Sequence, residues 1–176
     1  VGNKRTIEML NGFYGIADNV ILIEDQGELS IGENRLQFYL TPMVHWPETM
    51  MTYIPEKKVL FSGDAFGTFG TLDGGVLDTQ LHPERYYDEM IRYYSNIVGK
   101  FGSPVQTALK KLSGLGINAI CSTHGPVWTL PENIAKVVGM YDQLSRYDAG
   151  NGLVIAYGSM YGNTEELAEI IRVYMK

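Results

Sequence analysis

Short apolar segments bounded by turn residues fill the first third of the chain, and they limit its fold more than any other feature. We expect four strands here, over residues 19–23, 36–40, 50–54 and 59–61. Glycine, asparagine and aspartate lie between the first two segments, and a Pro-Glu-Lys-Lys turn joins the last two. Short strands separated by tight turns indicate an antiparallel meander.

The pattern changes after residue 82. Apolar residues recur at helical spacing over residues 83–98, 103–112 and 131–146, and a buried strand is expected over residues 117–122. Ser103 followed by Pro104 is typical of a helix start, with Ser103 as the N-cap. A meander followed by helices predicts an α+β fold.

A linker is expected at residues 149–152, after a first domain that spans residues 1–148. An apolar strand over 153–157 and a helix over 163–176 follow it. One strand and one helix cannot bury a core of their own, so we interpret residues 153–176 as the opening unit of a second, α/β domain. The alternative is that they complete the preceding domain.

Composition excludes several classes of function. The 176 residues carry a net charge of −6, which argues against a nucleic-acid-binding surface. No apolar run is long enough for a membrane span. The start has no signal-peptide pattern and no methionine, so we expect the chain to be part of something longer. The single cysteine, Cys121, excludes an internal disulfide framework and favours a cytoplasmic location.

His45, Asp64 and His124 each come soon after a predicted strand, where a rigid sheet can present side chains to a site. Imidazole and carboxylate are ligands that suit zinc or iron. The alternative is a pair of packed surface histidines and an aspartate that forms a turn. Sequence spacing by itself leaves both interpretations open.

The sequence motifs around these three residues resemble those of a known protein family. The three motifs lie at residues 41–50 (TPMVHWPETM), 60–67 (LFSGDAFG) and 122–126 (STHGP). In order and approximate spacing they resemble the flavodiiron proteins. The resemblance implies the second half of a metallo-β-lactamase-like αββα sandwich over residues 1–148, followed by the first β-loop-α unit of a flavodoxin-like domain.

The resemblance also implies a chemistry. Members of this family reduce dioxygen to water or nitric oxide to nitrous oxide at two non-haem irons. By this resemblance His45 binds one iron, His124 binds the other and Asp64 bridges them, with no catalytic residue separate from these ligands. Electrons arrive through FMN from a rubredoxin-like or flavin donor, and the parent protein is a head-to-tail homodimer.

One family motif is missing from this chain. The ligand group His-x-Glu-x-Asp-His is expected upstream of His45, and no histidine precedes His45. Three ligands give each of two irons only two protein donors, one of them shared. We therefore expect that the chain alone holds no stable diiron site and is inactive.

Residues 157–164 (YGSMYGNT) lie between the last predicted strand and helix. Hydroxyls and free N–H groups at a helix N-terminus form an anion site. The loop is similar to the flavodoxin loop that holds the FMN phosphate, which assigns cofactor binding to Ser159, Met160, Tyr161, Gly162, Asn163 and Thr164. The alternative is a purely structural role, in which these polar residues are helix caps. We expect no stable FMN binding by this chain.

Two other functions stay open. A dizinc hydrolase of the same fold has His, Asp and His in the same order, and a histidine in place of the glutamate of the upstream motif would indicate it. A half-domain with an open sheet edge could instead be a non-catalytic, self-associating protein. The choice between oxygen and nitric oxide is not decided by the sequence.

Overall fold

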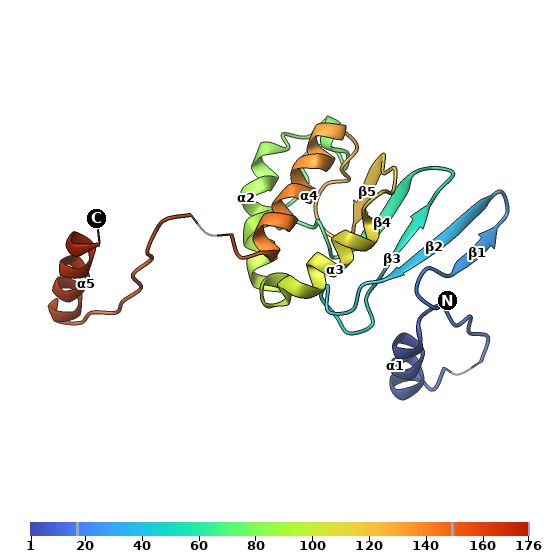
Figure 1. Ribbon diagram of the computed structural model, residues 1–176, viewed down its shortest axis with the longest axis horizontal. Helices are drawn as coiled ribbons and strands as arrows, with labels where there is room; N and C mark the ends of the chain where they lie inside the picture. The colour runs from blue at the N-terminus through green and yellow to red at the C-terminus, as the bar shows by residue number, and fades with distance from the viewer. Residues whose placement is uncertain (17, 149, 176) are drawn as a thin grey trace.

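The computed structural model describes residues 1–16, 18–148 and 150–175. Its centre is one five-stranded sheet in which neighbouring strands follow each other along the chain (Figure 1). The strands are β1 (Glu28–Ile31), β2 (Asn34–Leu40), β3 (Met50–Ile54), β4 (Val59–Gly63) and β5 (Ala119–Ser122). The first four pair antiparallel and β5 pairs parallel to β4. The predicted meander and the mixed α and β fold are confirmed.

Two tight turns set the register of the meander. Gly32 adopts a left-handed conformation (φ 60°) between β1 and β2, where a side chain would be strained. The β3–β4 turn places Tyr53 opposite Leu60. Because neighbours along a strand point to opposite faces, this register puts the larger apolar side chains on one face.

Three helices cover that face (Figure 1). Helix α2 (Glu84–Tyr93) continues through a π-helical turn, η2 (Tyr94–Val98), and a 3-10 turn, η3 (Gly99–Phe101), into α3 (Gly102–Leu112). Helix α4 (Pro131–Ser145) packs on α3, and a short 3-10 helix, η1 (Asp78–Gln80), precedes α2. The buried core between the helices and the sheet includes Met51, Tyr53, Leu60, Ile120, Trp128 and Tyr141.

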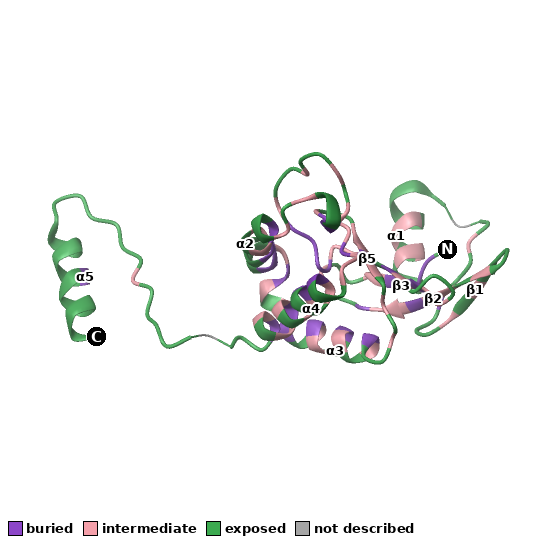
Figure 2. Cartoon of the chain, turned by 90° about the horizontal axis from the view of Figure 1, so that it is seen from above, coloured by how far each residue is buried: buried purple, intermediate pink, exposed green. Residues whose placement is uncertain are grey.

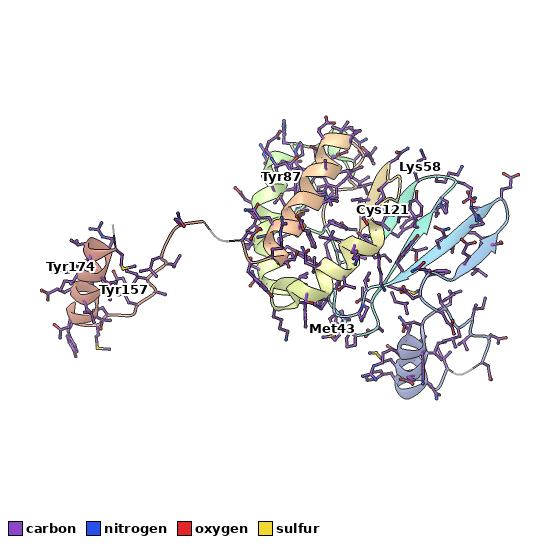
Figure 3. The ribbon with its side chains drawn as sticks, in the orientation of Figure 1. Met43, Lys58, Tyr87, Cys121, Tyr157 and Tyr174 are labelled. Atoms are coloured by element: carbon purple, nitrogen blue, oxygen red, sulfur yellow. The ribbon has the colours of Figure 1, made fainter. Side chains whose placement is uncertain are left out.

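Within the described ranges, no helical layer covers the opposite face of the sheet. We call it the open face and define it by Thr52, Ile54, Val59, Phe61 and Cys121, which the strand registers place on one side. None of the five is fully buried, and Phe61 is 46% exposed. Cys121 lies on β5, the strand next to β4 (Figure 3).

The expected strand over residues 19–23 is wrong. Only Leu22 forms a bridge, with Gly2, and the place beside β2 is taken by β1. Helix α1 (Lys4–Tyr14) precedes this segment and was not expected, although Asn3 caps it by accepting a hydrogen bond from the Thr6 N–H. The N-cap assigned to Ser103 is also wrong, because α3 begins one residue earlier at Gly102.

The strand expected over residues 153–157 is also wrong. Residues 153–157 are extended coil, Val154 is 93% exposed, and no described strand lies beside them to supply hydrogen-bond partners. Helix α5 (Asn163–Tyr174) follows, and the segment beyond α4 is almost entirely exposed (Figure 2). Tyr157 and Tyr174 both lie in this separate segment (Figure 3). Ala149 in the expected linker and Lys176 at the expected helix end lie outside the described residues.

Among the residues described, none of the helices has both the length and the apolar character that crossing a bilayer requires.

Candidate metal centre

His45 is presented by a compact loop that connects β2 to β3. Thr41 N–H donates to the Thr49 carbonyl (2.9 Å), which closes the base of the loop. Inside it, the Trp46 N–H donates to the Thr49 hydroxyl at 3.0 Å. The His45 ring packs beside Trp46, with ring centroids 5.5 Å apart. This loop, which includes Met43 (Figure 3), fixes His45 at the end of the sheet.

Asp64 begins the turn that follows β4. Gly63 has a positive φ of 60°, which redirects the chain at the end of the strand. The Ser62 hydroxyl donates to the Ala65 carbonyl (2.7 Å) and the Gly67 N–H donates to the Asp64 carbonyl. Both hydrogen bonds hold the turn and so restrict where the Asp64 side chain can lie.

His124 follows β5 at the same edge of the sheet, because β4 and β5 run parallel. Its carbonyl accepts hydrogen bonds from the Ser122 hydroxyl (2.6 Å) and the Thr68 N–H (3.3 Å). Gly125 follows with a φ of 84°, and any side chain there would collide with the Thr68 hydroxyl. The close approach of these two segments holds the backbone of His124 in place.

The three predicted ligands come together in space. The Asp64 carboxylate lies between the two imidazoles, with its Oδ2 3.1 Å from His45 Nε2 and its Oδ1 3.5 Å from His124 Nε2. The side chains of His45 and Asp64 are about three-quarters covered, and that of His124 is 56% exposed. Two residues far apart in sequence thus approach the same carboxylate from opposite sides.

This donor set fits a carboxylate shared between two metal ions. Each Asp64 oxygen faces a different imidazole, so the arrangement gives two half-sites and not one enclosed site. Within the described ranges, no group of three or more His, Cys, Asp or Glu side chains is arranged to hold a metal ion. Nitrogen and oxygen donors of this kind suit iron or zinc, and a shared carboxylate reduces the repulsion between two cations.

Two further side chains border this site. The Thr123 hydroxyl donates a hydrogen bond to Asp64 Oδ1 at 2.6 Å. The buried ring of Tyr93 lies 5.7 Å from the His124 ring. Burial and the Asp64 charge both raise the Tyr93 pKa, so its phenol stays protonated at neutral pH. Sequence reasoning assigned no role at this site to Tyr93 or Thr123, and the position of Thr123 after a strand and before His124 is the one available signal.

Comparison with known proteins identifies the family. The model of the family described as ODP family beta lactamase matches residues 2–125. A solved variant of the flavo di-iron protein from Thermotoga maritima superimposes with a TM-score of 0.87 at 29% identity, over 99% of this chain and 43% of that chain. The chain belongs to the flavodiiron protein family.

Other flavodiiron relatives extend the comparison. The rubredoxin oxygen:oxidoreductase from Desulfovibrio gigas superimposes with a TM-score of 0.90 at 25% identity, over 99% of this chain and 44% of that chain. The nitric oxide reductase of Moorella thermoacetica is 30% identical over 96% of this chain and 42% of its own length. The chain thus spans less than half the length of the curated relatives it matches. These named relatives are oxidoreductases.

The second predicted site of this flavodiiron chain is the loop before α5. Gly162 turns the chain with a φ of 86°, and its N–H donates to the Ser159 hydroxyl at 3.0 Å. No side chain caps α5, which leaves first-turn N–H groups for an anion, although Glu165 and Glu166 add negative charge in the same turn. Ser159, Met160, Tyr161, Gly162, Asn163 and Thr164 are all exposed. The described part of the chain does not enclose this loop, and phosphate or flavin binding there stays a prediction.

Proposed function

We propose that this chain is part of an oxidoreductase that reduces dioxygen to water, nitric oxide to nitrous oxide, or both, at a non-haem diiron site. The observation that carries the proposal is the Asp64 carboxylate with one oxygen toward each imidazole. The donor set suits iron or zinc, and the reductase names of the relatives favour iron redox chemistry over the dizinc hydrolase.

In this proposal His45 holds one metal, His124 holds the other, and Asp64 contacts both. When bound, a pair of irons supplies electrons and two adjacent positions for a diatomic substrate. The chain itself contributes the spacing of the ligands, because the β2–β3 loop and the paired ends of β4 and β5 fix their backbones. Tyr93 covers one side of His124 with an uncharged, buried ring.

The domain boundary belongs to the same proposal. Residues 1–148 form the C-terminal half of the metal domain, 149–152 the linker and 153–176 the start of an FMN domain. The exposed apolar residues of α5, such as Leu167 (56%), support this assignment, because an amphipathic helix of this kind needs further chain to cover it. The loop over 159–164 would hold the FMN phosphate, and a homodimer with a rubredoxin-like or flavin donor would complete electron transfer.

The test uses the longest reading frame that contains this chain. We expect the purified protein to hold two irons and one FMN per chain and to consume nitric oxide or oxygen when a rubredoxin-like donor is reduced. Asp64→Asn should lose iron and reduce turnover by more than the ~10–100-fold that changes around metal ligands cost. Asp73→Asn, an exposed aspartate, is the matched control. Two zincs together with ester or thioester hydrolysis would contradict the proposal.

A further inference from the structure

Thr123 lies beside Asp64 because of the parallel pairing of β4 and β5. Its backbone N–H donates to the Gly63 carbonyl at 2.9 Å, which aligns the two strand ends. Its hydroxyl then donates to Asp64 Oδ1 at 2.6 Å, a distance typical of a hydroxyl bonded to an ionised carboxylate. The carboxylate also has His45 Nε2 3.1 Å from Oδ2 and His124 Nε2 3.5 Å from Oδ1, and the Thr123 hydroxyl is the hydroxyl donor on Oδ1.

The hydrogen bond decides how the carboxylate is turned. The terminal torsion of an aspartate is broad, so the carboxylate plane is not set by the side chain itself. A donor on Oδ1 restricts this plane, and in this orientation Oδ2 lies 3.1 Å from His45 Nε2 and Oδ1 lies 3.5 Å from His124 Nε2. Without the donor the carboxylate can rotate and turn both oxygens away from the two half-sites.

We propose that Thr123 is a positioning residue for the metal centre: its hydroxyl holds Asp64 with one oxygen toward each histidine. The inference rests on the proposed function, because it assigns a role around the same bridging carboxylate. It concerns the hydroxyl group, and not the volume of the side chain. A serine at position 123 keeps the role and a valine loses it.

The test is anaerobic titration of the metal-free protein encoded by the longest reading frame that contains this chain, with Co²⁺ alone, a spectroscopic probe that accepts nitrogen and oxygen ligands. Binding is followed by visible absorption and by quenching of Trp46, whose ring is 5.5 Å from His45. Thr123→Val is expected to weaken Co²⁺ binding about 10-fold or more and to change the absorption spectrum. Thr123→Ser should stay within about twofold of the unchanged chain, since it keeps the donor.

Thr107→Val is the matched control, because the Thr107 hydroxyl bonds only within α3 and lies exposed. Thermal unfolding of each variant shows that the chain is folded, and Thr123→Ala replaces Thr123→Val if the latter does not fold. Equal Co²⁺ affinity in Thr123→Val and the unchanged chain overturns the inference while the metal site stands. An equal loss in the serine and valine variants also overturns it, because the hydroxyl is then irrelevant. If the unchanged chain binds no more Co²⁺ than Asp64→Ala, the metal site itself fails, and the inference with it.

Discussion

At the scale of single residues, the buried polar groups of this chain serve the helix layer as well as the metal centre. Asp78 is 1% exposed, and its carboxylate accepts hydrogen bonds from the Thr129 hydroxyl (2.5 Å), the Leu130 N–H (3.0 Å) and the Asn133 amide (2.9 Å). Leu130 is the N-cap of α4, whose own side chain cannot cap. Asp78 therefore acts as a cap from a distant part of the chain.

Asp78→Asn is predicted to destabilise the fold by about 2 kcal/mol, because an amide leaves buried donors without an acceptor. Burial raises the Asp78 pKa, but the hydrogen bonds from Thr129, Asn133 and Leu130 lower it by more, so that it lies below its ordinary value of 3.8. Because the Asp78 pKa is lower in the folded chain, the unfolded chain binds a proton on Asp78 at a higher pH than the folded chain does. The contribution of the Asp78 carboxylate to the free energy of unfolding is present above about pH 4 and is lost as the pH falls through the lowered pKa.

Urea unfolding of Asp78→Asn and the unchanged chain, at pH 7 and near pH 3, measures both effects. The difference in the free energy of unfolding between Asp78→Asn and the unchanged chain should be smaller near pH 3 than at pH 7. Asp73→Asn, on the surface, is the control. A stability unchanged by Asp78→Asn at pH 7 would show that the hydrogen bonds do not stabilise α4.

At the scale of elements, one lysine ties the helix layer to the edge of the meander. The Lys111 ammonium on α3 donates to Asp25 Oδ2 (2.7 Å) and to the Leu40 carbonyl (2.6 Å). Asp25 in turn accepts a hydrogen bond from the Leu40 N–H at 2.8 Å. The end of β2, the turn before β1 and the last turn of α3 thus share one polar cluster, directly before the loop that carries His45.

Lys111→Met is predicted to destabilise the chain by about 1 kcal/mol, because the ammonium is partly covered and makes two short hydrogen bonds. Lys110→Met, on the exposed neighbouring position, should have little effect. Urea unfolding of the two variants at low and moderate salt provides the measurement, because urea is uncharged and does not screen the ion pair. Equal midpoints for both would argue against a stabilising cluster.

The sequence pattern predicted strands correctly where the segment pairs with a neighbouring strand. The wrong strand predictions are the segments that have no such neighbour. Segment 50–54 matches β3, and the helix over 131–146 differs from α4 by one residue. Segments 19–23 and 153–157 have the same apolar character, but a strand also needs a neighbour, which composition does not reveal. His45, Asp64 and His124 were singled out because each follows a strand, and they do lie together, while their role as metal ligands stays a prediction. The role proposed for Thr123 depends on a distance across β4 and β5 that sequence spacing does not contain.

At the scale of the whole molecule, the described chain has a covered face and an open one. The helices bury the Leu60 side of the sheet, while Phe61, its neighbour on β4, is 46% exposed and the rest of the open face is partly exposed. Strand β1 adds an unpaired edge. Contiguous apolar surface and free strand edges both favour association.

The isolated chain is therefore predicted to self-associate. Its mass by light scattering should rise over a concentration series, and Phe61→Lys should flatten that rise by placing a charge on the open face. Ile91→Lys is the control, since it changes an exposed apolar residue on α2 instead. A strict monomer at high concentration would count against association through this face.

The parallel pairing of β4 with β5 also determines when the metal centre can form. Asp64 and Thr123 are separated by 59 positions, and the segment between them contains α2, α3 and the turns that connect them. Closing so long a loop has an entropic cost that only a folded helix layer offsets. In a nascent chain His45, Asp64 and His124 are therefore separate, and they come together only once β4 and β5 have paired. For the proposed metal centre, this means that metal binding follows folding and does not guide it.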